Sequence, residues 1–226
     1  MDWRHKRSDD QLILIRLSKN VNTVSVSSGK KDNELWAAFL KGDQQVLSLI
    51  YMLHVNALFD YGCRLSSDHD LIKDCIQDIF VTIIRNRNSL SPTDNVRLYL
   101  FKAFKRKLIR ELQKKNRYRQ IDPDQETYFG VSFLKSFDHA EGEITDQQKE
   151  KLSEAVKTLT SRQREAIYLR FIRGMNYHDI SVVMDLNYQS SRALIHRAIG
   201  KLREALHGQS EIFSRVLLSI FRRYLG

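Results

Sequence analysis

The chain contains little proline, glycine or cysteine: its 226 residues include 2 Pro, 9 Gly and 2 Cys. Sandwiches and barrels of β-strands need many tight turns, and glycine and proline build most of those turns, so this composition favours helices. The two cysteines, Cys63 and Cys75, are accompanied by no CxxC pair and by no histidines at metal-binding spacing. This pattern excludes a disulfide framework and a zinc finger, and it indicates a reducing compartment.

Long apolar runs and catalytic motifs are missing as well. Apolar clusters such as residues 12–15 and 216–221 are much shorter than the ~18 residues that a membrane-spanning helix requires. Residues 1–8 lack the apolar segment of a signal peptide. The sequence contains no GxxxxGKS/T, GxGxxG, HExxH or GxSxG motif, and its seven histidines are scattered. We therefore expect a cytoplasmic protein that is not an enzyme and that takes no cofactor, metal or small-molecule substrate.

Basic side chains outnumber acidic ones, 37 to 27, which gives the chain a formal charge of +10. Such an excess favours nucleic acid or an anionic membrane surface as the partner. The charge is unevenly distributed: residues 97–119 hold ten basic side chains and one acidic one, whereas residues 123–150 hold seven acidic and two basic ones. This change from +9 to −5 along the chain indicates a boundary between two domains.

Apolar residues recur at three- and four-residue spacing on both sides of this boundary, which is the pattern of amphipathic helices. We therefore predict an all-α fold of two small helical domains joined by a flexible acidic linker. The predicted segments are a mobile N-terminal extension over residues 1–32, a helical domain over 33–119, the linker over 120–150, a second helical domain over 151–207 and an amphipathic C-terminal helix over 208–226.

The second predicted domain has the proportions of a helix-turn-helix. Residues 160–163 read T-x-x-Q, a capping box that begins one helix, and Gly174 ends it. A short helix over 177–184 and a longer one over 188–206 follow, separated by the three-residue turn 185–187.

The longer of these two helices has one apolar face and one polar face. The polar face presents residue types suited to DNA: Gln189, Ser190, Arg192, His196, Arg197 and Lys201. Gln189 and Arg192 lie in the first turns and can form bidentate hydrogen bonds with base edges in the major groove, whereas Arg197 and Lys201 suit phosphates. An ordinary helical hairpin with a solvated basic face is the alternative.

The first predicted domain carries an acidic stripe. Asp70, Asp74 and Asp78 recur every four residues on a helix whose start signal is the S-x-x-D sequence at 67–70. Like charges at this spacing repel one another, so a cationic protein partner would give the stripe a purpose. Simple solvation and a metal ion are the alternatives.

The predicted helix over residues 96–117 combines basic side chains with aromatic ones. Cations bind the nucleic-acid backbone, and aromatic rings such as those of Tyr99 and Tyr118 can stack on unpaired bases. This combination indicates single-stranded nucleic acid as a ligand, with a plain basic surface and locally packed tyrosines as the alternative.

Six runs of residues carry a family resemblance: DCIQDIF at 74–80, LTSRQRE at 159–165, LRF at 169–171, GMNYHDI at 174–180, HRA at 196–198 and KLR at 201–203. In this order and spacing they resemble motifs of the extracytoplasmic-function (ECF) subgroup of bacterial sigma-70-family factors, over about residues 33–206. The first run resembles the family's D-L-V-Q-E-x-F, and the next three resemble its series L-x-x-x-x-R, L-R-x and G-x-S-Y-x-E-I.

The resemblance implies a sigma factor that binds core RNA polymerase, recognises the minus-35 and minus-10 promoter elements, melts the promoter and starts transcription. The implied partners are promoter DNA, the β′ clamp and β subunits of core RNA polymerase, and an anti-sigma factor, which in this subgroup is often membrane-bound. The implied polymerase-binding residues are Asp70, Asp74, Gln77 and Asp78. The implied residues for minus-10 recognition and melting are Asn86, Asn95, Arg97, Lys102, Lys105, Arg106 and Arg110. The polar face of the 188–206 helix is the implied minus-35 reader.

Three residues depart from the family pattern. Asp185 occupies a turn position where the family usually has Gly, and Ser191 and Leu194 replace its usual Val and Arg, so base contacts cannot be transferred from other members. Two rival functions stay open. A standalone helix-turn-helix transcriptional regulator would bind duplex DNA without polymerase, but it leaves the acidic stripe unexplained. A basic RNA-binding or membrane-surface protein would not require the helix-turn-helix.

Overall fold

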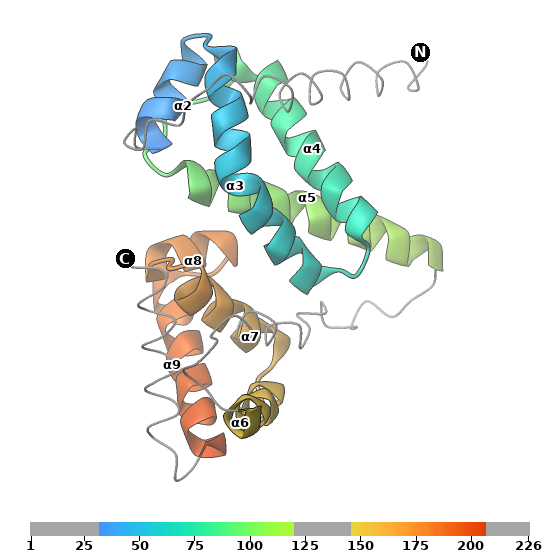
Figure 1. Cartoon of the computed structure of the whole chain (residues 1–226), viewed down its shortest axis with the longest axis vertical. Helices are drawn as coiled ribbons and strands as arrows, with labels where there is room; N and C mark the ends of the chain where they lie inside the picture. Colours follow the sequence, from blue (N-terminus) through green and yellow to red (C-terminus); the bar gives the residue numbers. More distant parts are fainter. Residues whose placement is uncertain (1–31, 120–145, 207–226) are drawn as a thin grey trace. The chain divides into compact units, whose positions relative to one another are not determined.

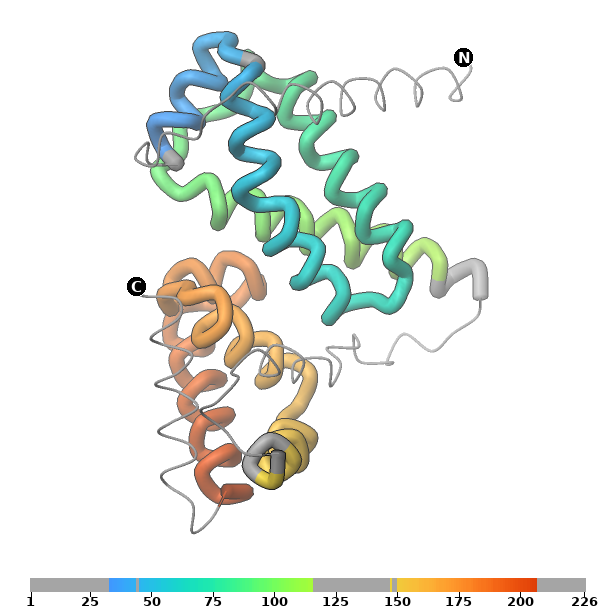
Figure 2. The backbone as a smooth tube through the Cα atoms, viewed as in Figure 1, coloured from blue at the N-terminus to red at the C-terminus, as the bar shows by residue number. Residues whose placement is uncertain are grey.

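The computed structural model describes residues 32–119 and 146–206, which form two compact units (Figures 1 and 2). Every regular element in these two ranges is a helix, which confirms the predicted all-α fold class. The predicted N-terminal extension, most of the predicted linker and the predicted C-terminal helix lie outside the described residues.

The first unit contains four α-helices and one short 3₁₀ turn. They are α2 (Asp32–Leu40), α3 (Gln44–Leu65), α4 (His69–Arg85), the 3₁₀ turn η2 (Arg87–Ser89) and α5 (Val96–Arg119). Helix α4 packs against α5. The buried residues of these two helices include Ile72, Cys75, Ile76, Ile79, Phe80 and Ile83 from α4, and Val96, Leu100, Phe101, Phe104 and Leu108 from α5. This pairing places the acidic helix beside the basic one.

Helix α3 forms the third side of this core. The Tyr61 ring lies 5.3 Å, centre to centre, from the ring of Phe101. A Cβ atom added to Gly62 would lie 2.6 Å from Cγ2 of Ile72 and 2.8 Å from Cζ of Phe104, so only glycine allows this close approach of the three helices. Residues 45–65 are also long and apolar enough, by composition, to cross a membrane. The burial of α3 residues such as Leu58 explains that hydropathy as the property of a core helix.

The start of α4 corrects one sequence-based prediction. The S-x-x-D pattern at 67–70 predicts Ser67 as the N-cap, but the cap is Asp68, whose Oδ1 accepts a hydrogen bond from the backbone N of Leu71 at 3.0 Å. The Lys115 ammonium from α5 donates to Oδ2 of the same carboxylate at 2.5 Å. This contact joins the cap of α4 to a residue of α5 that lies 47 positions away in sequence.

The second unit contains α6 (Asp146–Lys157), α7 (Ser161–Ile167), the π-helical turn η4 (Tyr168–Ile172), α8 (Tyr177–Val183) and α9 (Tyr188–Ala205). Helix α9 packs against α6, α7 and α8. The apolar residues buried in this unit include Leu152, Val156, Ile167, Ile180, Val183, Ile195, Ala198 and Leu202. Helix α6 already begins at Asp146, so residues 146–150, which the charge pattern assigned to the linker, are helical.

Local capping signals set the helix ends of this unit. Thr160 and Gln163 form the predicted capping box, in which each side chain accepts a hydrogen bond from the other residue's backbone N–H, at 3.3 and 3.0 Å. The backbone at Gly174 has φ of 62°, and Asp185, in the turn between α8 and α9, has φ of 50°. Asp185 therefore adopts the left-handed conformation at the turn position where the family that the sequence resembles usually has glycine. The helix-turn-helix forms in spite of that substitution.

Candidate nucleic-acid and protein interfaces

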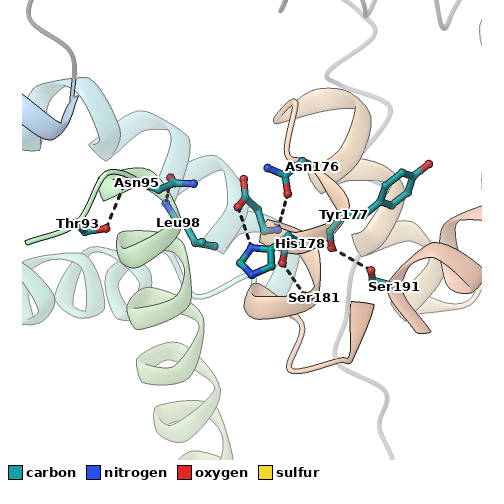
Figure 3. A network of polar contacts seen from close by, with 9 residues as sticks. Thr93, Asn95, Leu98, Asn176, Tyr177, His178, Ser181 and Ser191 are labelled. Carbon is teal, nitrogen blue, oxygen red and sulfur yellow. Dashed lines mark hydrogen bonds and ion pairs between the residues drawn. The ribbon is translucent and has the colours of Figure 1, made fainter. Parts of the chain in front are cut away.

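Helix α9 begins at a side-chain cap and contacts α8 through a buried hydroxyl. The side chain of Asn187 caps the helix, since its Oδ1 accepts a hydrogen bond from the Ser190 backbone N at 2.7 Å. The hydroxyl of Ser191, which is fully buried, lies 3.0 Å from the Tyr177 carbonyl oxygen of α8 (Figure 3). The same hydroxyl lies 2.8 Å from the Tyr188 carbonyl oxygen of its own helix, so its hydrogen-bonding need is met and a buried serine is tolerated at this position.

The outer face of α9 has the polar character that its sequence predicts. Gln189, Arg192, His196, Arg197 and Lys201 are exposed, and Ser190 is half-buried. The opposite face is closed, because Ile195, Ala198 and Leu202 are buried. The structure therefore brings all six predicted residues onto the solvent side of one helix.

The start of α9 carries aromatic residues that the sequence analysis did not select. Tyr188, the first residue of the helix, is 45% exposed, and its ring meets the ring of Tyr177 edge to face with centres 6.4 Å apart. The guanidinium of Arg192 lies over both rings. The available signal was the pair of tyrosines at the first residues of two adjacent helices.

The acidic stripe on α4 exists, but its members differ in their partners. Asp70, Asp74 and Asp78 are exposed, whereas Gln77 is half-buried. The Asp78 carboxylate forms an ion pair with the Lys107 ammonium of α5, with 2.7 Å between Oδ2 and Nζ. Partial burial tends to lower the pKa of Lys107, but the hydrogen bond and charge of Asp78 outweigh this effect and raise the pKa.

The ion pair of Asp78 with Lys107 makes the two ends of the acidic stripe unequally accessible to a partner. Asp70 has a weaker contact within its own helix, 3.3 Å from the ammonium of Lys73, and its side chain is 92% exposed. Repulsion within the stripe is thus partly relieved inside the molecule, by Lys107 at one end and Lys73 at the other. The Asp70 end is the more accessible one for a cationic partner.

The predicted residues of the loop between α4 and α5 have structural tasks. Asn95 caps α5: its Oδ1 accepts a hydrogen bond from the Leu98 backbone N at 2.9 Å, and its own backbone N donates to Thr93 Oγ1 at 3.2 Å (Figure 3). Asn86 is the C-terminal cap residue of α4, and its carbonyl oxygen accepts a hydrogen bond from the Ser89 backbone N at 2.8 Å. Both asparagines therefore shape the loop, whatever they contact in a complex.

Helix α2 fixes this loop from the other side. The indole Nε1 of Trp36 donates a hydrogen bond to the carbonyl oxygen of Ser91 at 3.1 Å, and the Trp36 side chain is buried. Its ring centre lies 5.3 Å from that of Tyr99 on α5. Tyr99 thus packs locally, as the alternative interpretation expected. The side chain of Tyr118 lies outside the described residues.

The cations of α5 divide between two faces. Lys107 and Lys115 pair with carboxylates at the α4 side. The residues predicted to contact DNA lie elsewhere on the helix: Arg106 and Arg110 are exposed, and Arg97, Lys102 and Lys105 are half-buried. The guanidinium carbon of Arg97 lies 5.9 Å from the ring centre of Phe101. These five residues form the basic part of α5 that lies apart from the Lys107 and Lys115 ion pairs.

The described residues hold no group of three or more His, Cys, Asp or Glu side chains that could bind a metal ion. Burial raises the pKa of the Cys75 thiol to about 12, so this side chain is not a thiolate near neutral pH. His178 Nδ1 lies 3.8 Å from Oδ1 of Asp179 at the start of α8, where the imidazole is exposed (Figure 3).

Comparisons with known proteins agree with this division into two units. The family model described as "Sigma-70 region 2" matches residues 50–118, and "Sigma-70, region 4" matches residues 149–202, so that together they match more than half of the chain. Two similar curated proteins are sigma factors by name. The ECF RNA polymerase sigma factor EcfG of Rhodopseudomonas palustris is 26% identical over 153 residues, which are 68% of this chain and 81% of EcfG. The ECF RNA polymerase sigma factor SigM of Bacillus subtilis is 21% identical over 154 residues, 68% of this chain and 91% of SigM.

A solved structure has the same fold. CnrH, in complex with the cytosolic domain of CnrY, aligns with a TM-score of 0.52 and 21% identity, covering 80% of this chain and 100% of CnrH.

Proposed function

Because the chain belongs to the ECF subgroup of the sigma-70 family of RNA polymerase sigma factors, we propose that its two units divide the work of promoter recognition. The chain is a transcription initiation factor that directs core RNA polymerase to promoters. In this proposal, the first unit binds core polymerase and opens the minus-10 element, and the second unit reads the minus-35 element in duplex DNA.

One observation carries the assignment of the second unit: α9 exposes Gln189 and Arg192 in its first turns while its other face is buried against α6, α7 and α8. A helix presented in this way can enter the major groove with its N-terminal residues toward base edges. The cations nearer its end, Arg197 and Lys201, suit the flanking phosphates.

The first unit supplies surfaces for a protein and for DNA. The α4 surface formed by Asp70, Asp74, Gln77 and Asp78 contacts the β′ clamp of core polymerase in this proposal. The loop over residues 86–95 receives an unpaired base. Beside this loop, α5 supports the separated strand through Arg97, Lys102, Lys105, Arg106 and Arg110. In this proposal, the predicted linker between the two units runs past the β subunit of core polymerase.

Regulation and location complete the proposal. An anti-sigma factor binds this chain and withholds it from polymerase; CnrH, which shares the fold, binds the cytosolic domain of another protein. Sigma factors are non-enzymatic, so RNA synthesis belongs to the catalytic centre of core polymerase, and the chain acts where that polymerase is, in the cytoplasm.

Core-polymerase binding tests the proposal for α4. Asp70→Lys with Asp74→Lys reverses the accessible end of the acidic stripe, and we expect the double variant to lose more than tenfold in affinity for purified core polymerase. Glu34→Lys with Glu154→Lys makes the same charge change on α2 and α6 and should bind like the wild type. Retention of binding by the α4 variant, with an unchanged circular dichroism spectrum, would remove α4 from the polymerase interface.

A further inference from the structure

Cations and aromatic rings alternate at the start of α9. The guanidinium carbon of Arg170 lies 4.9 Å from the ring centre of Tyr177. The guanidinium carbon of Arg192 lies 5.9 Å from the ring centre of Tyr177 and 5.9 Å from that of Tyr188. The two tyrosine rings are nearly perpendicular, at 83°. Arg192 is therefore in contact with two rings that also contact each other.

Arg170, Tyr177, Arg192 and Tyr188 thus form a stack of alternating cations and rings. One side of this stack is held by hydrogen bonds, and the other side faces solvent. Arg170 donates a hydrogen bond from Nη1 to the carbonyl oxygen of Met175 at 2.9 Å, which fixes the cation beneath the Tyr177 ring. The Tyr177 backbone is tied to α9 by the Ser191 hydroxyl (Figure 3). Tyr188 closes the stack at the solvent side with 45% of its surface exposed.

The stack restricts a side chain that is otherwise among the most mobile. A free arginine loses much rotamer freedom when it binds, and cation–π contacts on two rings reduce that loss by ordering the guanidinium beforehand. Ordering matters most for a bidentate contact, because both N–H groups must meet two acceptors in one plane. In the major groove, guanine offers such a pair of acceptors, O6 and N7.

We propose that Tyr188 is a positioning residue for sequence readout, which together with Tyr177 orients Arg192 toward a guanine of the upstream promoter element. The inference rests on the proposed function of α9 as the minus-35 reader. The aromatic ring of Tyr188 orients the Arg192 guanidinium and the Tyr188 hydroxyl does not, since a cation–π contact depends on the ring.

The test is a double-variant comparison in the complete holoenzyme, made from core polymerase and the full chain. Promoters randomised over the upstream element are selected by binding with the wild type, Arg192→Ala, Tyr188→Leu, Tyr188→Phe and the double variant Tyr188→Leu with Arg192→Ala. The readout is the preference for guanine over the other bases at each position. This ratio is internal to each variant, so an overall loss of active protein cancels. His178→Ala, an exposed change on α8, is the control.

We expect Arg192→Ala to lose about tenfold in guanine preference at one base pair. Tyr188→Leu should lose about threefold at that same pair, whereas Tyr188→Phe and His178→Ala keep the wild-type preference. The double variant should match Arg192→Ala alone, because Tyr188 acts only through the arginine.

Two sets of results would overturn the inference, and they differ in what they imply for α9. Suppose that Arg192→Ala lowers the guanine preference. If Tyr188→Leu then weakens binding to all sequences equally, or if the double variant has a lower guanine preference than Arg192→Ala alone, the positioning role fails and the minus-35 assignment stands. If neither variant changes base preference at any position, the assignment of α9 as the reader fails together with the inference.

Discussion

Glycine at position 62 is required by packing, whereas glycine at position 200 is not. We predict that Gly62→Ala destabilises the first unit by about 1–3 kcal/mol, because its Cβ would overlap Ile72 and Phe104 in a filled core. Gly200→Ala, in α9 with no atom near the added Cβ, should stabilise the second unit by about 0.5–1 kcal/mol through reduced chain entropy. Urea unfolding of each variant measures both effects. A Gly62→Ala variant as stable as the wild type would contradict the packing around Gly62, and a destabilised Gly200→Ala variant would contradict the open space around Gly200.

The cap of α4 gives stability that depends on pH. The Lys115 hydrogen bond, followed by that from the Leu71 backbone, lowers the pKa of Asp68. A lowered pKa in the folded state means that the contribution is complete above the unfolded value of about 3.9 and is lost as pH falls through the folded pKa. We predict that Asp68→Ala costs about 1 kcal/mol at neutral pH and less in acid, where protonation of the carboxyl weakens its contacts with Lys115 and the helix start.

Ser67→Ala is the matched control for that measurement. Ser67 is exposed and adjacent, and the sequence pattern made it the expected cap. Thermal unfolding of both variants at several pH values separates the two possibilities. A larger loss for Ser67→Ala than for Asp68→Ala would show that the serine caps the helix.

At the scale of elements, α2 positions the loop over residues 86–95. We predict that Trp36→Phe, which keeps an aromatic ring but removes the Nε1 donor to the Ser91 carbonyl, costs about 1 kcal/mol and speeds amide hydrogen exchange in this loop. Exchange in α9 serves as the internal reference and should not change. Unchanged exchange in the loop would mean that α2 does not restrain it.

Local signals predicted helix ends well, and contacts between distant residues decided the rest. Thr160 and Gln163 lie in one turn, so their capping box is visible in the sequence. By contrast, Lys115 of α5 contacts the Asp68 cap, and Lys107 of α5 partly compensates the charge of the acidic stripe through its ion pair with Asp78. Such pairs depend on how α4 and α5 pack, which no short sequence pattern encodes.

The candidate DNA-binding residues also include some features that the sequence predicts and others that depend on the packing of distant residues. The polar face of α9 follows from helical periodicity, and all of its predicted residues lie on that face. The contact of Arg192 with the rings of Tyr177 and Tyr188 depends on the turn between α8 and α9, so it became visible only in three dimensions. Asn95, a predicted DNA contact, also caps α5, a role that any asparagine before a helix can take, and its contact with DNA stays a prediction.

At the scale of the whole molecule, the charge of +10 is spread over surfaces with different tasks. Within the first unit, Lys107 and Lys115 neutralise carboxylates near α4, whereas Lys102 and Arg110 make no ion pair in the described part of the chain. Cations without acidic partners can release counterions from DNA when they bind phosphates. Net charge alone therefore overstates the surface that is available to nucleic acid, and we propose that this surface lies on the α5 and α9 faces.

Above all, we propose that this chain directs core RNA polymerase to specific promoters. The most direct measurement maps the 5′ ends of transcripts made from a promoter library by core polymerase alone and by core polymerase with the purified chain. We predict defined start sites only when both are present, preceded by a shared upstream element and a shared downstream element. Start sites that do not depend on the chain, combined with tight binding of the chain alone to the upstream duplex, would contradict the claim and identify a standalone helix-turn-helix regulator.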